Sequence, residues 1–293
     1  LDAASTKTTE ALVTYYNQSS SNPKTKDGLF LEQLYFQYGR YLGISCSRGS
    51  LPVPSNLQGL WNDKASAPWH SDIHTNINVQ MNYWPMEPTN LSECHMPYLD
   101  YIINMVNSPG WKKAASNAGN PGWTVYTESN IFGGMSGWMS NYVVANAWYC
   151  THLWQHYRYT LDKAFLQRAF PAMWSAAQFW LSRLKKNSKD GTYECPAEFS
   201  PENHNVPSED ATAHAQQLVL ELLQNTKDAY DILGASPSDD DATLKRKYRD
   251  LAKKYHPDAL RAQGLPDEMI GKANEKMAKI NAAWSTVKSS RGL

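Results

Sequence analysis

This sequence of 293 residues has few cysteines and no long hydrophobic run. The four cysteines lie far apart and include no C-x-x-C pair, so they form neither a disulfide scaffold nor a cysteine metal site. No apolar stretch approaches the ~18 residues that a transmembrane helix needs, so we expect no membrane span. The formal net charge is zero, which gives the whole molecule no electrostatic footprint for nucleic acid.

Several catalytic signatures are missing as well. There is no G-x-S-x-G elbow and no P-loop, which leaves serine hydrolase and nucleotide-binding functions without support. Two histidine pairs, His70/His74 and His152/His156, have the i, i+4 spacing of a metal-binding helix. Neither pair includes the Glu of H-E-x-x-H, and no third ligand is evident. We therefore expect no metal site and no cofactor.

Tryptophan and charge divide the chain near Tyr230. Ten of the eleven tryptophans and all four cysteines come before this point. Residues 1–228 carry a formal charge of −3, whereas residues 229–293 carry +3. Two different kinds of sequence meet here, and we expect two domains with these bounds.

The first segment has the pattern of an α-helical protein. Apolar residues recur at helical spacing from Phe30 to Leu42, and similar patterns follow around 96–107, 140–158, 163–185 and 209–233. Few stretches alternate with period two, so strands should be scarce. Long loops rich in Gly, Pro, Asn and Trp separate the helical patterns, at 46–74, 108–138 and 187–208. Loops of this length in a compact domain are usually functional.

The loop sequence from His74 to Pro85 concentrates groups that suit sugar binding. It holds four side-chain amides, one histidine and two large aromatics. Amides offer donors and acceptors to hydroxyls without charge, and aromatic rings offer flat apolar faces to a sugar ring. More tryptophans lie in or beside the loops: Trp61, Trp69, Trp84, Trp123 and Trp138. The alternative is that the tryptophans only bury apolar area and the amides cap helices.

Three glutamates near the end of this segment are candidate acids: Glu194, Glu198 and Glu202. A glycoside hydrolase needs one carboxylic acid to protonate the leaving oxygen and a second group to activate water or attack. A Glu in a proline-punctuated loop can be partly desolvated, which raises its pKa toward that of a general acid. The alternative for each is an ordinary solvated carboxylate, and these arguments do not choose among the three.

Several motifs, in one order, resemble glycoside hydrolase family 95, the α-L-fucosidases with an (α/α)6 barrel. They are FQYGRYL at 36–42, LPVPSNLQGLWN at 51–62, HTNINVQMNYWP at 74–85, NLSE at 90–93, HLW at 152–154 and SPE at 200–202. The resemblance covers roughly residues 1–233. It implies an inverting glycosidase that acts on fucosylated oligosaccharides.

The resemblance also implies roles for particular residues. Glu202 matches the family's general acid, and Asn76 and Asn78 match the pair that orients and activates water. His74, Trp84 and Trp138 would line the sugar pocket. The family's catalytic Asp lies in a later Gly-rich motif that has no counterpart here, and the N-terminal β-sandwich is also absent. The chain accounts for six or seven helices where the barrel needs twelve, so we expect an incomplete (α/α)6 barrel and no release of L-fucose.

The C-terminal segment has the pattern of a helical hairpin. Leu244, Tyr248, Leu251 and Tyr255 form one apolar stripe, and a second stripe runs from Ile270 to Val287. The stretch 241–255 carries six basic residues against two acidic ones, a pattern typical of a solvated helix face or of a docking surface. His256-Pro257-Asp258 stands between the two helical patterns, where Pro257 ends the first helix.

Together with Tyr230-x-x-Leu233-Gly234, this pattern resembles a J domain of the kind that ends bacterial DjlA-type co-chaperones. The resemblance implies a DnaK-type chaperone as partner, whose ATP hydrolysis the module stimulates. The groups expected to dock on it are His256, Pro257, Asp258, Lys245, Arg246 and Arg249. The alternative is a generic helical hairpin.

Three hypotheses follow for the whole chain. It is a family-95-type glycosidase, catalytically incomplete and fused to a J domain, or a co-chaperone with a non-catalytic N-terminal scaffold, or an artificial chimera without a joint function. The expected compartments conflict, because such glycosidases usually work outside the cytoplasm whereas DnaK-type partners lie inside. The localisation is therefore left open.

Overall fold

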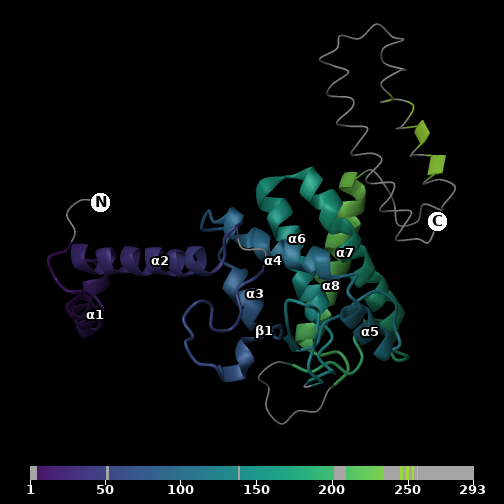
Figure 1. The fold of residues 1–293 in the computed structure, drawn as a ribbon, viewed down its shortest axis with the longest axis horizontal. Helices are drawn as coiled ribbons and strands as arrows, with labels where there is room; N and C mark the ends of the chain where they lie inside the picture. Colours follow the sequence, from purple (N-terminus) through teal and green to yellow (C-terminus); the bar gives the residue numbers. More distant parts are fainter. Residues whose placement is uncertain are drawn as a thin grey trace, which may run out of the picture.

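The computed structural model describes residues 5–50, 53–137, 139–200 and 209–233, with 245–246, 249–250, 253 and 256. This part of the chain is mostly helical, with eight α-helices and two small two-stranded sheets. The prediction of an all-α fold is confirmed, and the arrangement fits part of a helical barrel (Figure 1). The predicted C-terminal helical hairpin lies almost entirely outside the described residues.

The helices alternate with long connections. They are α1 (Thr9–Gln18), α2 (Lys26–Cys46), α3 (Asn78–Tyr83), α4 (Ser92–Met105), α5 (Pro109–Asn117), α6 (Ala145–Thr160), α7 (Lys163–Arg183) and α8 (Ala213–Leu233). Antiparallel strands β1 (Ile73–His74) and β2 (Glu128–Ser129) pair across one long connection, and β3 (Lys185–Lys186) pairs with β4 (Tyr193–Glu194). Short 3-10 helices lie at Asn22–Lys24 and Pro68–Ser71.

Local chemistry sets where the helices begin and end. Asp162 caps α7, because its carboxylate accepts the backbone N–H groups of Ala164 and Phe165. Leu161, just before it, has a left-handed backbone with φ of 54°, which ends α6. Ser108 caps α5, where Pro109 occupies the first turn. The α6–α7 connection is therefore a tight turn that places these two helices side by side.

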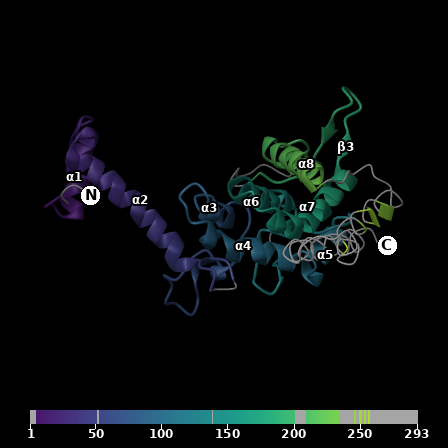
Figure 2. The same ribbon diagram turned by 90° about the horizontal axis from the view of Figure 1, so that it is seen from above.

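The core lies where α6, α7 and α8 pack together, with α4 against α6 and α7 (Figures 1 and 2). Trp111 and Trp123 are fully buried and stack with ring centroids 5.1 Å apart. The indole N–H of Trp123 donates to the backbone oxygen of Ala172 in α7, and that of Trp180 donates to the Asn146 amide in α6. Large aromatic area is thus buried, and the indole N–H groups of Trp123 and Trp180 are satisfied, whereas that of Trp111 is buried without a partner in the described part of the chain.

Helices α1 and α2 form an arm that projects away from this core (Figure 2). The expected helix over Phe30–Leu42 is confirmed as part of α2. Its apolar stripe, however, is largely exposed: Leu34, Tyr35, Phe36, Tyr38 and Tyr41 are all accessible to solvent. The periodicity predicted the helix correctly, but the described residues supply little to cover it.

Two expectations about loops and helix number were wrong. The stretch 108–138 was expected to be a loop, but it contains α5. Helix α1 lies in a mostly polar stretch for which no helix was predicted. The described residues alone hold eight α-helices, more than the six or seven expected. Short helices such as α5 escape detection because two turns give too few positions to establish a period. None of the described helices combines the length and apolarity that a membrane span needs.

Helix α8 crosses the expected domain boundary. It runs without interruption from Ala213 to Leu233, close to the predicted helix over 209–233. The composition of the chain changes at residue 228, but the backbone there stays helical. The last helix of the first segment therefore continues into the second.

Candidate functional site

The candidate site is built around the segment that joins β1 to α3. In β1, Ile73 and His74 pair with Ser129 and Glu128 of β2. The next residue, Thr75, extends this pairing, since its N–H donates to the Thr127 oxygen at 2.8 Å and its hydroxyl donates to the Tyr126 oxygen at 2.9 Å. These bonds fix the backbone immediately before Asn76.

Asn76 is buried, and Asn78 is half-buried as the first residue of α3. The backbone oxygen of Asn76 accepts a hydrogen bond from the Tyr142 hydroxyl at 3.2 Å. Its side-chain Oδ1 is buried and accepts no hydrogen bond within the described part of the chain. An unsatisfied buried acceptor is costly, on the order of 1–3 kcal/mol, so this atom is suited to hold a water molecule or a ligand hydroxyl.

Tyr142 links Asn76 to His214 at the start of α8. The Tyr142 oxygen lies 3.1 Å from Nε2 of His214, and the two rings stack with centroids 5.9 Å apart. Burial lowers the pKa of His214 and raises that of Tyr142 well above its usual value, so both are neutral at pH 7. The single hydroxyl proton of Tyr142 goes to Asn76, so His214 donates its Nε2 proton to Tyr142.

A groove of about 720 Å³ runs between α6 and α8 beside this cluster. Trp84, Trp148 and His214 line one part of it. The ring of Trp148 meets Trp84 edge-on at 6.4 Å and His214 at 5.3 Å. Polar and charged side chains continue along the groove: Thr151, His152, Gln155, Arg158, Gln217 and Glu221. The volume is in the range of small-molecule sites, and the lining mixes aromatic faces with hydrogen-bonding groups.

The other predicted sugar-binding residues lie elsewhere or outside the described residues. His74 is buried, with Nδ1 3.1 Å from the Asp72 carboxylate, and does not line the groove. Trp84 is 48% exposed and does line it. Trp138 lies outside the described residues. Trp123, one of the loop tryptophans, is fully buried, so the alternative of simple apolar burial is correct for that residue.

The three candidate acids differ in surroundings. Glu202 lies outside the described residues, and Glu194 accepts a hydrogen bond from the Asn187 amide. Glu198 is fully buried, and burial raises its pKa to about 7, although Arg183 and the backbone N–H of Val143 favour the charged form. The expected pKa increase thus occurs at Glu198. Its carboxylate contacts Arg183 at 3.1 Å and Val143 at 3.2 Å, which makes it an internal anchor.

Glu198 is also paired with Glu209 through its backbone. Its backbone forms a two-way antiparallel bridge with Glu209, with N···O distances of 3.0 and 3.2 Å. Its side chain holds the backbone of Val143, which is next to Tyr142. Glu198 and Glu209 are therefore held together next to Val143, whereas residues 201–208 lie outside the described part of the chain.

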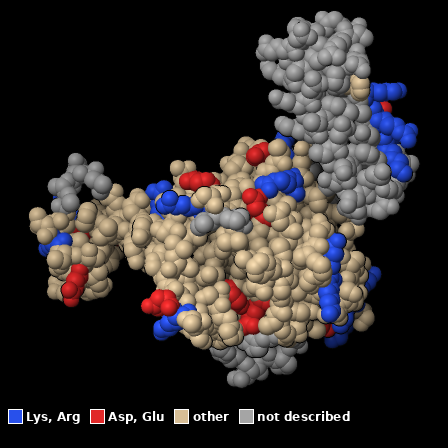
Figure 3. Space-filling view, viewed as in Figure 1, with Lys and Arg blue, Asp and Glu red and all other residues tan. Residues whose placement is uncertain are grey.

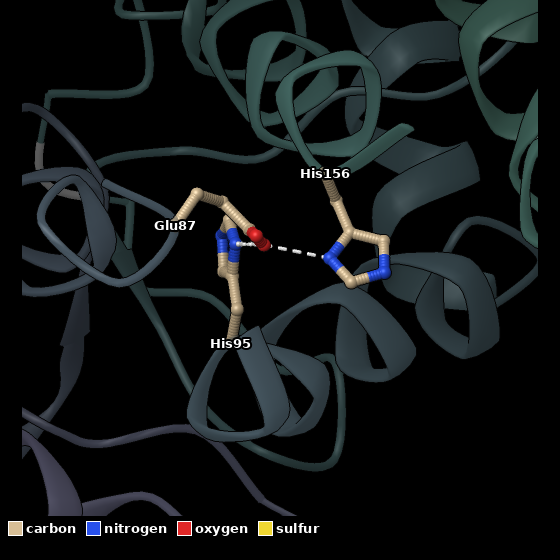
Figure 4. A group of neighbouring side chains, drawn as sticks. All are labelled: Glu87, His95 and His156. Atoms are coloured by element: carbon tan, nitrogen blue, oxygen red, sulfur yellow. Dashed lines mark hydrogen bonds and ion pairs between the residues drawn. The ribbon is translucent and has the colours of Figure 1, made fainter. Parts of the chain in front are cut away.

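A second buried cluster joins Glu87, His95 and His156 (Figure 4). Oε1 of Glu87 lies 2.8 Å from Nδ1 of His95 on α4 and 2.6 Å from Nδ1 of His156 on α6. Ser92 donates to the other carboxylate oxygen at 2.6 Å. Burial alone would raise the pKa of Glu87, but these three hydrogen bonds hold it well below its usual range. Glu87 is thus a buried carboxylate stabilised by donors from two helices.

This cluster bears on the question of a metal. Glu87, His95 and His156 place three ligand atoms within 4.8 Å of one another, so His156 does have the neighbouring ligands that were not evident from the sequence. Ligands on a tetrahedral zinc ion stand about 3.3 Å apart, whereas Glu87 lies at hydrogen-bond distance from both rings. These distances favour hydrogen bonds from the two histidines to the Glu87 carboxylate over coordination of a zinc ion by the three side chains. The other pair, His70 and His74, does not lie on a helix, so the spacing was misleading there.

Four of the six predicted chaperone-binding residues lie in the described part of the chain. Lys245, Arg246 and Arg249 are helical, as expected, and Arg246 and Arg249 are exposed. His256 is exposed and non-helical, whereas Pro257 and Asp258 lie outside the described residues. On the face drawn in Figure 3, basic groups stand out along this segment, while charges on the helical body are scattered and of both signs.

Sequence reasoning missed four polar residues that the fold brings together: Glu87, His95, Tyr142 and His214. Each is a single polar or aromatic residue in an apolar context, and partners such as Glu87 and His156 are 69 positions apart. The spacing of His152 and His156 was the only signal near this cluster. Its metal interpretation was weighed and set aside, and in the structure the two rings form hydrogen bonds with different partners, His95 for His152 and Glu87 for His156.

Fold and site together define a mostly helical, barrel-type protein with an aromatic and amide-lined groove between helices. The family model "Glycosyl hydrolase family 95 catalytic domain" matches residues 1–278. Probable alpha-fucosidase A of Aspergillus niger is 38% identical over 228 residues, which cover 74% of this chain and 28% of that protein. Alpha-L-fucosidase 2 of Arabidopsis thaliana is 39% identical over 210 residues, which cover 69% of this chain and 24% of that protein. The chain belongs to glycosyl hydrolase family 95.

A shorter stretch is similar to a different kind of protein. Co-chaperone protein DjlA of Escherichia coli K12 is 44% identical over 66 residues, which are 22% of this chain and 24% of that protein. Both resemblances drawn from the sequence are therefore confirmed. The chain spans only about a quarter of the length of its curated relatives, 24–28% for the fucosidases just described.

Proposed function

We propose that the groove between α6 and α8 binds a saccharide that ends in L-fucose, as part of a family 95 catalytic site. The observation that carries this proposal is the buried, unsatisfied Oδ1 of Asn76, which Tyr142 and His214 connect to the Trp84–Trp148 wall of the groove. The aromatic wall offers faces to the apolar side of the sugar ring. The similarity to fucosidases supports L-fucose as the recognised unit.

In this proposal, Glu202 is the general acid, and Asn76 and Asn78 hold the attacking water, with the inverting outcome typical of the family. The role of Glu202 rests on the resemblance of Ser200-Pro201-Glu202 to the family motif, since Glu202 lies outside the described residues. Trp138 completes the proposed set of sugar-binding residues, and His74, which does not line the groove, is left out of it. Hydrolysis by residues 1–293 is expected to be absent, because they contain no counterpart of the family's water-activating Asp.

Tryptophan fluorescence of the full chain tests the binding step. Addition of L-fucose should change the emission, and Trp84→Ala should remove most of that change. Trp61→Ala is a matched control, since Trp61 is similarly exposed but does not line this groove. Equal responses from the two variants would refute the assignment of the groove. A fucosylated trisaccharide incubated with the chain should release no L-fucose, and robust turnover would contradict the expected loss of hydrolysis.

We also propose that the C-terminal segment acts as a J domain and stimulates the ATPase of a DnaK-type chaperone. The similarity to DjlA and the sequence His256-Pro257-Asp258 support this second function. The basic residues Lys245, Arg246 and Arg249 would contact the chaperone. Such a module has no chemistry of its own and favours a hydrolysis-competent state of its partner.

The domain division that we propose is 1–228 for the glycosidase part and 229–293 for the J domain. The family 95 match extends to residue 278, and α8 continues to Leu233, so the two parts share a helix at their junction. A natural fusion and an artificial chimera are both compatible with this arrangement. Limited proteolysis followed by mass spectrometry would locate the junction.

A further inference from the structure

A chain of three buried side chains leads from the interior to the wall of the groove. Oε1 of Glu87 lies 2.8 Å from Nδ1 of His95, and Nε2 of His95 lies 3.0 Å from Nδ1 of His152. All three residues are buried, and His152 is one of the residues that line the groove. Figure 4 shows its first two members, Glu87 and His95. The chain therefore ends where a bound saccharide would lie.

The acceptor character of Glu87 fixes the protons along this chain. An ionised carboxylate only accepts, so His95 must carry its proton on Nδ1. His95 is neutral, because burial lowers its pKa despite the neighbouring carboxylate, and its Nε2 is then an acceptor. His152 must therefore donate from Nδ1. Burial and the adjacent His95 lower the pKa of His152 well below its usual value, which leaves its Nε2 unprotonated.

The two nitrogens of an imidazole point in divergent directions, so Nε2 of His152 faces away from His95. Among the described residues, no hydrogen bond satisfies this atom, although Nδ1 of the same ring is bonded. A neutral acceptor at a groove wall suits a neutral donor, and a sugar hydroxyl is such a donor. The fixed tautomer would discriminate, because a site built to bond a hydroxyl disfavours an analogue that lacks it.

We propose that Nε2 of His152 accepts a hydrogen bond from a hydroxyl of the bound saccharide, in an assignment that rests on the saccharide site proposed above. Glu87 and His95 are positioning residues that act through His152 and do not touch the sugar. His156 bonds the same carboxylate but lies on a separate branch, off the route to the groove. His152 and His156, one turn apart on α6, thus have different proposed roles: His152 contacts the saccharide and His156 does not.

The experiment is ¹⁵N NMR of the full chain labelled at histidine and tryptophan, with His152→Gln used to assign the signals of His152. Without ligand, His152 should show a protonated Nδ1 and an unprotonated Nε2. Addition of L-fucose should then move the Nε2 signal together with the indole signals of Trp84 and Trp148. A protonated Nε2 in the free chain would overturn the proposal.

The ligand titration separates two kinds of failure. Indole signals that move while His152 stays still would leave the saccharide site intact and refute the role of His152. If L-fucose moves neither the indole nor the histidine signals, the saccharide site fails and the assignment of His152 fails with it. The histidine signals of the free chain are measured in either case.

Two variants test the positioning residues. Glu87→Gln should let His152 populate both tautomers and weaken L-fucose binding about fivefold, the equivalent of one hydrogen bond of about 1 kcal/mol. His156→Gln removes another donor from the same carboxylate and should leave both the tautomer and the affinity unchanged. Equal effects of the two variants would show that the cluster is only structural. If Glu87→Gln fails to fold, the tautomer of His152 in the unmutated chain still tests the proposal, since a protonated Nε2 would refute it.

Discussion

The hydroxyl of Tyr142 joins two segments that are far apart in the chain, bonding the backbone oxygen of Asn76 at 3.2 Å and Nε2 of His214 at 3.1 Å. One phenol thus sets the position of the proposed water-holding amide relative to the groove wall. Such a contact orients the site without touching the ligand. Its removal should therefore affect binding as well as stability.

Tyr142→Phe should weaken L-fucose binding about fivefold and lower the free energy of unfolding by about 2 kcal/mol, because the two hydrogen bonds of the buried hydroxyl are lost. Isothermal titration and chemical denaturation measure the two quantities. Tyr101→Phe is the matched control, since the buried Tyr101 hydroxyl also makes two hydrogen bonds, to Ser129 and the Asn130 oxygen, but bonds neither Asn76 nor His214. The control should lose similar stability and keep its affinity. Loss of affinity in both variants would argue against a specific role for Tyr142.

The helices could be predicted from the sequence because their periodic patterns are local. Residues 163–185 gave a strong pattern, and α7 runs from Lys163 to Arg183. The amide- and aromatic-rich stretch from His74 to Pro85 could be recognised in the same way, whereas Asn76 and Asn78 were singled out by the resemblance to family 95. These features depend on neighbours in the chain, which the sequence displays directly.

The rest of the site depends on packing between distant segments. Trp84 and Trp123 both lie in or beside loops, yet one is 48% exposed and the other is fully buried between Trp111 and α7. Glu87 gains its partners from α4 and α6, and nothing in its local sequence indicates a buried, ionised carboxylate. The i, i+4 spacing of His70 and His74 suggested one face of an α-helix. The structure has no α-helix there, because the backbone at Trp69 and His70 has positive φ angles.

Glu198 should make the stability of the protein depend on pH. Its pKa in the folded state is about 7, against 4.5 for the free side chain. The folded state therefore binds more protons than the unfolded state between these values. The contribution of Glu198 is fully present below about pH 4.5 and is lost as pH rises through 7, by roughly 3 kcal/mol. Glu198→Gln should remove this slope, measured as the difference between the two proteins in urea unfolding at pH 5 and pH 8.

The matched control for Glu198→Gln is Glu194→Gln, a glutamate in the same region that is only half-buried. That variant should follow the unmutated protein at both pH values. A Glu198→Gln difference that is the same at pH 5 and pH 8 would mean that Glu198 stays ionised beside Arg183 across the range. The attraction of Arg183 would then lower the pKa of Glu198 more than burial raises it.

Glu87 should have the opposite pH dependence. Its folded pKa lies well below the unfolded value, so its contribution is present above the unfolded pKa, near 4.5, and is lost as pH falls below it. Glu87→Gln should therefore destabilise the protein most at neutral pH and progressively less in acid. Urea unfolding between pH 3 and pH 7 measures the difference. A constant difference across this range would show that charge on Glu87 contributes little.

His256→Gln should abolish the stimulation of ATP hydrolysis by a DnaK-type chaperone, because His256 begins the His-Pro-Asp sequence expected to contact that partner. His256 is exposed, so the substitution should leave the fold of the chain unchanged. Single-turnover ATPase rates of the chaperone, with and without the full chain, measure the effect. His70→Gln is the control, since it replaces an exposed histidine in the first segment and should preserve stimulation. Stimulation that survives in His256→Gln would remove the basis for a chaperone partner, whereas loss in both variants would point to a general defect of the chain.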